Sequence, residues 1–264
     1  MKDYLNEYYN RYDEDSRLLT RYGHIEYITT MKYVEMYLRP GMRILEIGAG
    51  TGRYSHALAQ KGYQVDAVEL VAHNIEIFRN NTKPGENITI MQGNAKDLNG
   101  FTEDTYDITL LLGSMYHLYT LEDKLKALSE AIRVTRPGGL VYAAYCMGDA
   151  SVLMYGFGRG KIHEILEKCM VDPDTFDTFS QPWDIFELHR KEDIDHLRSQ
   201  FDVTQLHFVA TDGYANHMRK TLEEMDEDTY RLFIQYHLAT CERIDMMGYS
   251  NHTLDIFKKN ELRH

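Results

Sequence analysis

The chain has few cysteines, a single tryptophan, few prolines and no long apolar run. Cys146, Cys169 and Cys241 form no C-x-x-C pair and no histidine-spaced set, so we expect neither a disulfide framework nor a metal site. No stretch approaches the ~20 uncharged apolar residues of a membrane-spanning helix. The first residues also lack the apolar middle of a signal peptide. These absences predict a cytoplasmic protein.

Basic residues are scarce relative to acidic ones. The chain has 29 Lys and Arg against 41 Asp and Glu, which gives a net charge of −12, and no basic stripe interrupts this excess. A surface of that sign repels phosphate backbones and anionic lipid. We therefore expect neither nucleic acid nor a membrane as a partner.

The remaining composition is that of a globular protein with one unusual feature. Apolar residues make up 43% and charged residues 27%, and no low-complexity tract suggests disorder. At about 150 residues per domain, 264 residues predict one large domain or one domain with a cap. The unusual feature is an excess of 20 Tyr, several of which cluster at the start of the chain.

Short strand-like runs alternate with helical patterns between residues 43 and 146. The expected strands are 43–47, 64–70, 88–92, 106–112 and 140–146, and the expected helices are 53–61, 72–81 and 121–134. The last helix places four apolar residues on one face, Leu121, Leu125, Leu128 and Ile132. Residues 106–112 are apolar on both faces, as a strand covered by helices on both sides requires. The pattern predicts a doubly wound, mostly parallel, seven-stranded Rossmann-like α/β sheet.

The segments around this alternation complete the predicted organisation. Residues 1–39 indicate an N-terminal helical arm or cap, and residues 40–146 with 191–264 indicate the Rossmann-like core. Residues 147–190 are a long aromatic connection, which is typical of a lid-like insertion. After it we expect a helix at 192–200, strands at 201–210 and 252–258, and a long helix from the N-cap Asp226 to Gly248.

A glycine-rich turn follows the first predicted strand. Gly48, Gly50 and Gly52 alternate with other residues and lead directly into a helix, so the backbone can turn tightly and approach a ligand. A dinucleotide site has the spacing G-x-G-x-x-G, whereas Arg53 stands where its third glycine would fall. The spacing favours an adenosine with an amino-acid tail over a pyrophosphate. The alternative is a strand-to-helix turn with no ligand.

The second predicted strand ends in an acidic residue, Glu69. Its carboxylate would lie beside the glycine turn at the carboxyl edge of the sheet, where it could accept hydrogen bonds from both hydroxyls of a ribose. Sites for NAD share this feature. The alternative is a solvated carboxylate that the dipole of the following helix favours.

Together with three further segments, these features resemble the class I S-adenosylmethionine-dependent methyltransferases. The matching positions are 46–52, Glu69, 92–98, 106–118 and 136–139. Five motifs in register are far more specific than a glycine turn alone. The resemblance covers residues 43–146 well and the last two strands loosely.

The resemblance implies S-adenosyl-L-methionine as cofactor and S-adenosyl-L-homocysteine as product. It implies cofactor contacts for ten residues: Glu46, Gly48, Gly50, Gly52, Glu69, Leu70, Asn94, Ala95, Leu112 and Gly113. The glycines would border the methionine and ribose, Glu69 would hold the ribose, and Asn94 and Ala95 the adenine edge. Leu112 and Gly113 would border the tail. Asn94 replaces the family's common Asp, and its amide can both accept and donate a hydrogen bond.

The N-terminal tyrosines and one histidine are candidates for further roles. Tyr rings in the arm could shield a sulfonium from water and attract its charge, and Arg17 or Arg53 could bind the cofactor carboxylate. The alternative for most of these tyrosines is packing. His117 follows the fourth strand and is the best-placed general base, although it could equally finish the strand by hydrogen bonding.

Methyl transfer needs mainly alignment and the exclusion of water, which fits a sequence with no triad and no metal cluster. The chain lacks the Asp/Asn-Pro-Pro-Tyr and Pro-Cys patterns of nucleic-acid methylation. We therefore expect a small-molecule methyl acceptor and a monomer or homodimer, and a protein acceptor stays open. The rival hypotheses are an NAD-type oxidoreductase and a non-catalytic cofactor-binding regulatory protein.

Overall fold

Seven strands run side by side in the order β3-β2-β1-β4-β5-β8-β7 in a computed structural model that describes residues 3–261, and a two-residue strand, β6, pairs with β5. The strands are β1 Arg43–Ile47, β2 Gln64–Glu69, β3 Ile88–Gln92, β4 Tyr106–Leu111, β5 Thr135–Met147, β6 Leu188–His189, β7 Val203–Ala210 and β8 His252–Lys259. All pairs are parallel except those of β8, which is antiparallel to both of its neighbours. The predicted mostly parallel sheet is confirmed.

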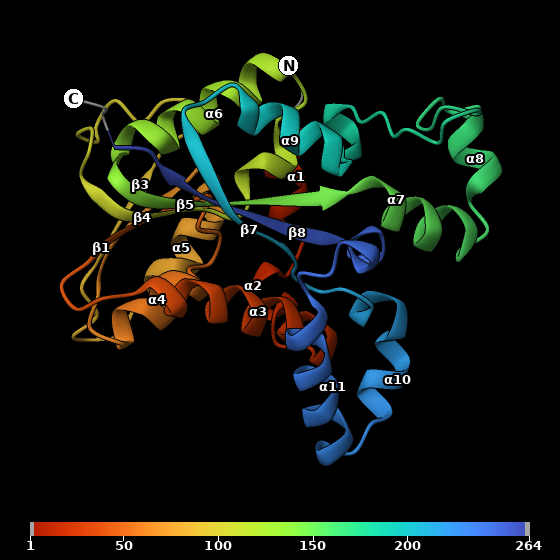
Figure 1. The fold of residues 1–264 in the computed structure, drawn as a ribbon, viewed down its shortest axis with the longest axis horizontal. Coiled ribbons are helices and arrows are strands. Elements are labelled where there is room, and N and C mark those ends of the chain that lie inside the picture. The colour runs from red at the N-terminus through yellow and green to blue at the C-terminus, as the bar shows by residue number, and fades with distance from the viewer. Residues whose placement is uncertain (1–2, 262–264) are drawn as a thin grey trace.

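Helices cover both faces of the sheet, as Figure 1 shows. The α-helices within residues 3–261 are α1 Tyr4–Tyr9, α2 Glu14–Arg17, α3 Arg21–Tyr37, α4 Arg53–Gln60, α5 Ala72–Asn81, α6 Leu121–Val134, α7 Gly148–Ser151, α8 Ile162–Glu167, α9 Lys191–Ser199, α10 Arg219–Glu224 and α11 Glu227–Thr240. Neighbouring residues of β1 point to opposite faces: Ile44 packs with α3 and α4, whereas Leu45 packs with α6 and α9. This alternation explains why the central strands are apolar throughout.

Residues 3–39 hold three helices, of which α3 packs against the sheet. Ile25, Met31 and Val34 of α3 are buried, and the side chain of Thr20 caps the helix by accepting from the N–H of Gly23. The predicted arm also included residues 1 and 2, and the predicted core included 262–264; both stretches lie outside the described residues. No helix within residues 3–261 is long and apolar enough to cross a membrane.

The segment 147–190 leaves the carboxyl end of β5 and returns to it. It contains α7, a π-helical turn at Val152–Phe157, α8 and a 3-10 turn at Pro182–Asp184. It then pairs with β5 as β6, with Cys146 opposite Leu188. In Figure 1 its helices extend away from the sheet at this end. The segment therefore lies at the edge where parallel strands finish.

Residues 211–251, between β7 and β8, form a second segment that leaves the sheet, here called the excursion. Its structure differs from the prediction. We expected one helix up to Gly248, but α11 ends at Thr240 and a separate 3-10 turn covers Ile244–Tyr249. The chain leaves the helix because the carbonyl of Cys241 accepts from Ala210 N–H at 2.8 Å, which ties it to β7. His237 on α11 meets Thr29 on α3 at 2.9 Å. Figure 1 accordingly shows α10 and α11 beyond α3 and away from the sheet.

The packing of α6 corrects one residue of the predicted stripe and gives a stability prediction. Leu128 is 1% exposed and packs in the core, whereas Leu121 is 51% exposed at the first turn. Leu128→Ala should lower the free energy of unfolding by about 2–5 kcal/mol, because it leaves a cavity. Leu121→Ala should change it by less than about 0.5 kcal/mol. Urea denaturation of both variants checks this, and equal losses would contradict the packing.

Candidate active site

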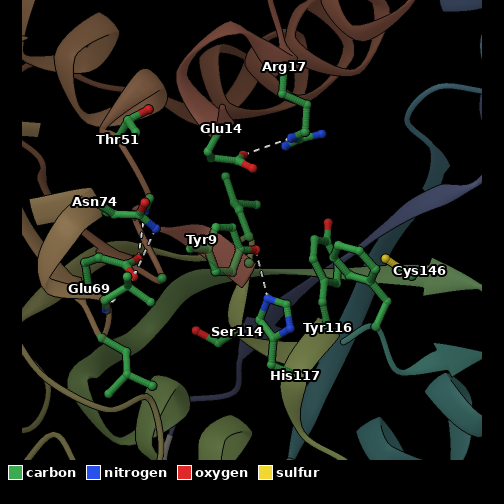
Figure 2. Close-up of a pocket in the computed structure, with 18 of the residues that line it drawn as sticks. Tyr9, Glu14, Arg17, Thr51, Glu69, Asn74, Ser114, Tyr116, His117 and Cys146 are labelled. Carbon is green, nitrogen blue, oxygen red and sulfur yellow. Dashed lines mark hydrogen bonds and ion pairs between the residues drawn. The ribbon is translucent and has the colours of Figure 1, made fainter. Parts of the chain in front are cut away.

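A cavity of about 550 Å³ opens at the carboxyl ends of β1, β2 and β4, where open α/β sheets bind ligands. Its walls come from the loops after these strands, from the arm α1 to α3, and from the excursion 211–251. Figure 2 shows its lining, with the ring of Tyr9 in the centre of the view. The volume lies in the range of small-molecule sites.

The loop after β1 approaches the loop after β4 so closely that side chains are excluded. Gly48 has a φ of +74°, and a Cβ there would lie 2.6 Å from the hydroxyl oxygen of Ser114. A Cβ on Gly113 would lie 3.0 Å from the carbonyl oxygen of Gly48. These two glycines therefore let the two strand ends meet, and both line the cavity.

The other two glycines of the turn have different roles. Gly50 has a φ of +54°, and the nearest atom to an added Cβ would be Glu14 Cγ at 3.7 Å, so this position faces the cavity. Gly52 does not line the cavity, contrary to the prediction. Its Cβ would lie 2.5 Å from the ring of Phe78, and it begins α4 with a φ of +89°. Gly52 is thus required by packing and by the turn.

Glu69 is buried beside this turn and is held by backbone N–H groups. Its Oε2 accepts from Gly50 N–H and its Oε1 from Val71 N–H, both at 2.8 Å, and the amide of Asn74 lies 3.5 Å from Oε1. The residue is 6% exposed, which excludes the solvated alternative. Burial raises the pKa of the carboxyl, and the donors at Val71 and Gly50 oppose that rise.

Glu46 lies deeper, beneath the start of α4. It is 2% exposed, and its Oε2 accepts from both the N–H and the hydroxyl of Ser55, with the N–H at 2.9 Å. It therefore satisfies an N–H of the first helical turn, as a capping side chain would. Burial raises the pKa of Glu46 to about 8, although the Ser55 donors act in the opposite direction.

The other residues implied by the resemblance also line the cavity: Leu70, Asn94, Ala95, Leu112 and Gly113. Leu70 is 42% exposed at the rim, and Ala95 is buried. The amide oxygen of Asn94 already accepts from Lys96 N–H at 3.0 Å. The second lone pair of this oxygen and the amide NH₂ stay available to a ligand.

His117 lies at the end of the 3-10 turn Ser114–His117, on the cavity wall. Its Nδ1 is 2.8 Å from the carbonyl oxygen of Ile185, which can only accept, so Nδ1 carries the proton and Nε2 the lone pair. Nε2 is 3.0 Å from the hydroxyl of Tyr9, which donates to it (Figure 2). Burial lowers the pKa of His117 to about 4 and raises that of Tyr9 well above its usual value.

Arg17 lines the cavity but already has two carboxylate partners. Its Nε is 2.9 Å from Glu14, and its guanidinium pairs with both oxygens of Glu26 at 2.7 and 3.3 Å. The predicted role in binding a cofactor carboxylate is therefore weakened, because its charge is compensated within the arm. Arg53 lies over the ring of Tyr27, 5.5 Å from its centroid.

The sequence reasoning missed the wall opposite the glycine turn. Its polar lining residues are far apart in the chain: Glu26, Asn216, Arg219, Asn251 and His252. Asp212 supports them by accepting from the side chains of Asn216 and His252. Asp212 lies two residues after the end of β7 and His252 begins the antiparallel β8, so both reach the same sheet edge. Their positions at strand ends were the signal available in the sequence.

Comparisons with known proteins agree with this geometry. Residues 45–143 match a family described as a methyltransferase domain. The chain is 29% identical over 137 residues to a demethylmenaquinone methyltransferase of Lysinibacillus sphaericus, which is 50% of this chain and 56% of that protein. It is also 29% identical over 128 residues to a ubiquinone biosynthesis O-methyltransferase of Methylocella silvestris, 48% of each chain. The chain thus spans about half the length of these relatives.

A solved structure extends the likeness to the whole fold. The CcbJ methyltransferase from Streptomyces caelestis superposes with a TM-score of 0.61 over 98% of this chain and 99% of that one, at 13% sequence identity. At that identity the likeness concerns the fold alone. It includes the arm and the excursions that the family match leaves out.

The raised pKa of Glu46 predicts a pH dependence of stability. Between the ordinary value of 4.5 and about 8, the folded protein holds a proton that the unfolded chain has released, so stability falls as pH rises through this window. Glu46→Gln lacks this titration. Its free energy of unfolding relative to wild type should rise by up to about 1.4 kcal/mol per pH unit there.

Urea denaturation at pH 5 and pH 8 measures this difference, with Glu76→Gln, an exposed position on α5, as the control. The control should follow the wild type at both pH values. If the difference in the free energy of unfolding between Glu46→Gln and wild type is the same at pH 5 and pH 8, the assignment of a buried proton to Glu46 is wrong.

Proposed function

We propose, from the match of residues 45–143 to a methyltransferase-domain family, that the protein is a class I S-adenosylmethionine-dependent methyltransferase that transfers the methyl group of S-adenosyl-L-methionine to a small-molecule acceptor. The observation that carries the proposal is the carboxylate of Glu69, fixed at 2.8 Å on the N–H of Gly50 at the edge of the cavity. A ribose is the ligand that such a carboxylate and bare backbone suit.

The residues present fit this cofactor. The open Cβ position of Gly50 leaves space for a ligand against the backbone. In the proposal Glu69 binds the ribose hydroxyls, Asn94 and Ala95 border the adenine, and Gly48, Leu112 and Gly113 border the amino-acid tail. Leu70 covers the outer edge. The cofactor supplies a methyl group that positive sulfur has activated for displacement.

An NAD-type site fits less well, for a reason beyond the glycine spacing. A pyrophosphate binds the free N–H groups at the start of the helix after the first strand. Here Glu46 already accepts from Ser55 N–H in the first turn of α4, and Gly52 is packed against Phe78. A phosphate at this place would meet a buried carboxyl, so we favour a nucleoside that has no phosphate and carries an amino-acid tail.

We assign the arm to covering the cavity and excluding water during transfer. Tyr8 stacks on Tyr12 with centroids 5.1 Å apart and meets Phe186 of the 147–190 segment edge-on at 5.6 Å. These rings join the arm to the lid-like segment over the cavity. Exclusion of water favours a displacement at carbon because it removes the competing hydration of the nucleophile.

His117 is proposed to position the arm, not to take the acceptor's proton. Its lone pair already binds the Tyr9 hydroxyl, and a pKa of about 4 makes it a weak base at neutral pH. It is neutral there and can keep accepting from Tyr9. This revises the sequence-based hypothesis of a general base.

The cofactor assignment is tested by calorimetric titration with S-adenosyl-L-methionine and, separately, with NADH. Only the first should bind. Gly50→Val should weaken that binding by about tenfold or more, because the side chain occupies the space of the ligand. Gly62→Val is the matched control, since Gly62 also has a positive φ and open space but lies away from the cavity.

Gly62→Val should lose stability from the strained backbone and keep its affinity. Equal affinity in a folded Gly50→Val variant, or binding of NADH in preference, would contradict the assignment. The regulatory alternative is separated by turnover: a catalyst forms S-adenosyl-L-homocysteine with an acceptor from a metabolite panel, and a binding protein does not.

If the arm covers the cavity, α1 should open more often when the hydrogen bond between Tyr9 and His117 is removed. Tyr9→Phe lacks the donated hydrogen bond and should increase hydrogen exchange of the α1 amides by about three- to tenfold. Bound S-adenosyl-L-homocysteine should dissociate faster as well. Tyr63→Phe, which removes a hydroxyl outside the cavity, serves as the control. Unchanged exchange of α1 would remove this role of Tyr9.

A further inference from the structure

The wall of the cavity opposite the glycine turn carries hydrogen-bond donors that have no protein partner. It is formed mainly by the excursion 211–251 and the first residue of β8, outside the part of the chain that matches the methyltransferase family. Because Glu69 and the glycine turn account for the cofactor half, this wall faces the space left for the acceptor. Its chemistry therefore bears on what the acceptor is.

Arg219 is the first of these donors. Its Nε and Nη2 both donate to the amide oxygen of Asn216, and its guanidinium lies 4.4 Å over the ring of Tyr22. These contacts fix the plane of the group. Within residues 3–261 no carboxylate lies in ion-pair range of Arg219, and its Nη1 has no hydrogen-bond partner. A positioned guanidinium of this kind suits a carboxylate.

His252 is the second donor. Its Nδ1 is 2.7 Å from the carboxylate of Asp212 and 3.5 Å from that of Glu26. Burial lowers the pKa of His252, but the two carboxylates outweigh it and hold the pKa well above its ordinary value. Both ring nitrogens then carry protons, and Nε2 has no partner among the described residues. The wall thus presents a second cationic donor to the cavity.

The carboxylates around the cavity are already occupied by donors. Glu14 and Glu26 pair with Arg17. Asp212 accepts from the side chains of Ser250, Asn216 and His252 and from two backbone N–H groups. A cationic ligand would have to share these oxygens with their present donors, whereas an anionic ligand would meet Nη1 of Arg219 and Nε2 of His252, which have no partner among residues 3–261.

A hydrogen-bonded chain connects the two cations on this wall. Arg219 donates to Asn216, Asn216 donates to Asp212, and Asp212 holds His252. The buried amide oxygen of Asn251, which also lines the cavity, has no partner and could accept from a hydroxyl or N–H of a ligand. The wall is therefore built for a polar ligand.

We propose that the acceptor is a small carboxylic acid whose carboxylate is bound by Arg219 and His252, with Arg219 as the principal anchor. This deepens the proposed methyl transfer and rests on it. Glu26, Asp212 and His252 could also be considered as metal ligands, since their donor atoms lie within 4.8 Å of one another. Arg17 already donates to Glu26 and His252 already donates to Asp212, so a metal ion would have to displace these donors, and the anion is favoured.

The test uses the full chain loaded with S-adenosyl-L-homocysteine, after the affinity for that compound has been measured by calorimetry. Binding of matched pairs is then compared by ligand-observed NMR, each pair being an acid and its primary amide: benzoate and benzamide, 4-hydroxybenzoate and its amide, indole-3-acetate and its amide. The variants are Arg219→Gln, Arg219→Lys and, as a control, Lys220→Gln, whose side chain is 89% exposed.

Wild type and Lys220→Gln should prefer the acid of at least one pair. In Arg219→Gln this preference should fall by about tenfold, the effect of one charged hydrogen bond, while the affinity for S-adenosyl-L-homocysteine stays unchanged. Arg219→Lys should restore part of it. Preference for the amides, no binding of any acid, or a preference that survives in Arg219→Gln would overturn the proposal.

The two proposals fail in different measurements. If S-adenosyl-L-homocysteine does not bind to the wild type, the proposed function is wrong, and the acid and amide pairs can still be compared on the unloaded protein. If it binds but acids are not preferred, only the assignment of the acceptor class is wrong.

Discussion

The hydrogen bond from Gly50 N–H to Glu69 is the contact on which the site depends, since it fixes the glycine turn after β1 to the end of β2 at the edge of the cavity. Glu46 completes the arrangement from below by accepting from Ser55 at the start of α4. Two buried carboxyls thus hold one short turn from both sides. Such groups are stable in the interior only because backbone donors satisfy them.

This arrangement also explains why the turn needs its glycines in three different ways. Gly48 allows the loops after β1 and β4 to touch, Gly50 leaves the cavity open, and Gly52 fits beneath Phe78 at the start of α4. The sequence spacing alone makes them look equivalent. Their separate roles appear only when the neighbours of each missing Cβ are known, because those neighbours are distant in the chain.

The cofactor half could be predicted because its signals are local. A strand, a glycine turn and a helix follow one another within a few residues, and Glu69 comes at the end of the next strand. The opposite wall could not, since Glu26, Arg219 and His252 are brought together only by the packing of α3, α10 and β8. The early end of α11 at Thr240 could not be predicted locally either, because it depends on the bond between Cys241 and β7.

The antiparallel strand β8 has a consequence for how the protein reaches its native state. β8 is inserted between β5 and β7, and β7 has no other partner in the sheet. Both strands therefore keep unpaired edges until β8 is in place, and exposed edges of this kind promote aggregation. His252 is the first residue of that strand, so the cavity wall opposite the glycine turn is completed only when β8 joins the sheet.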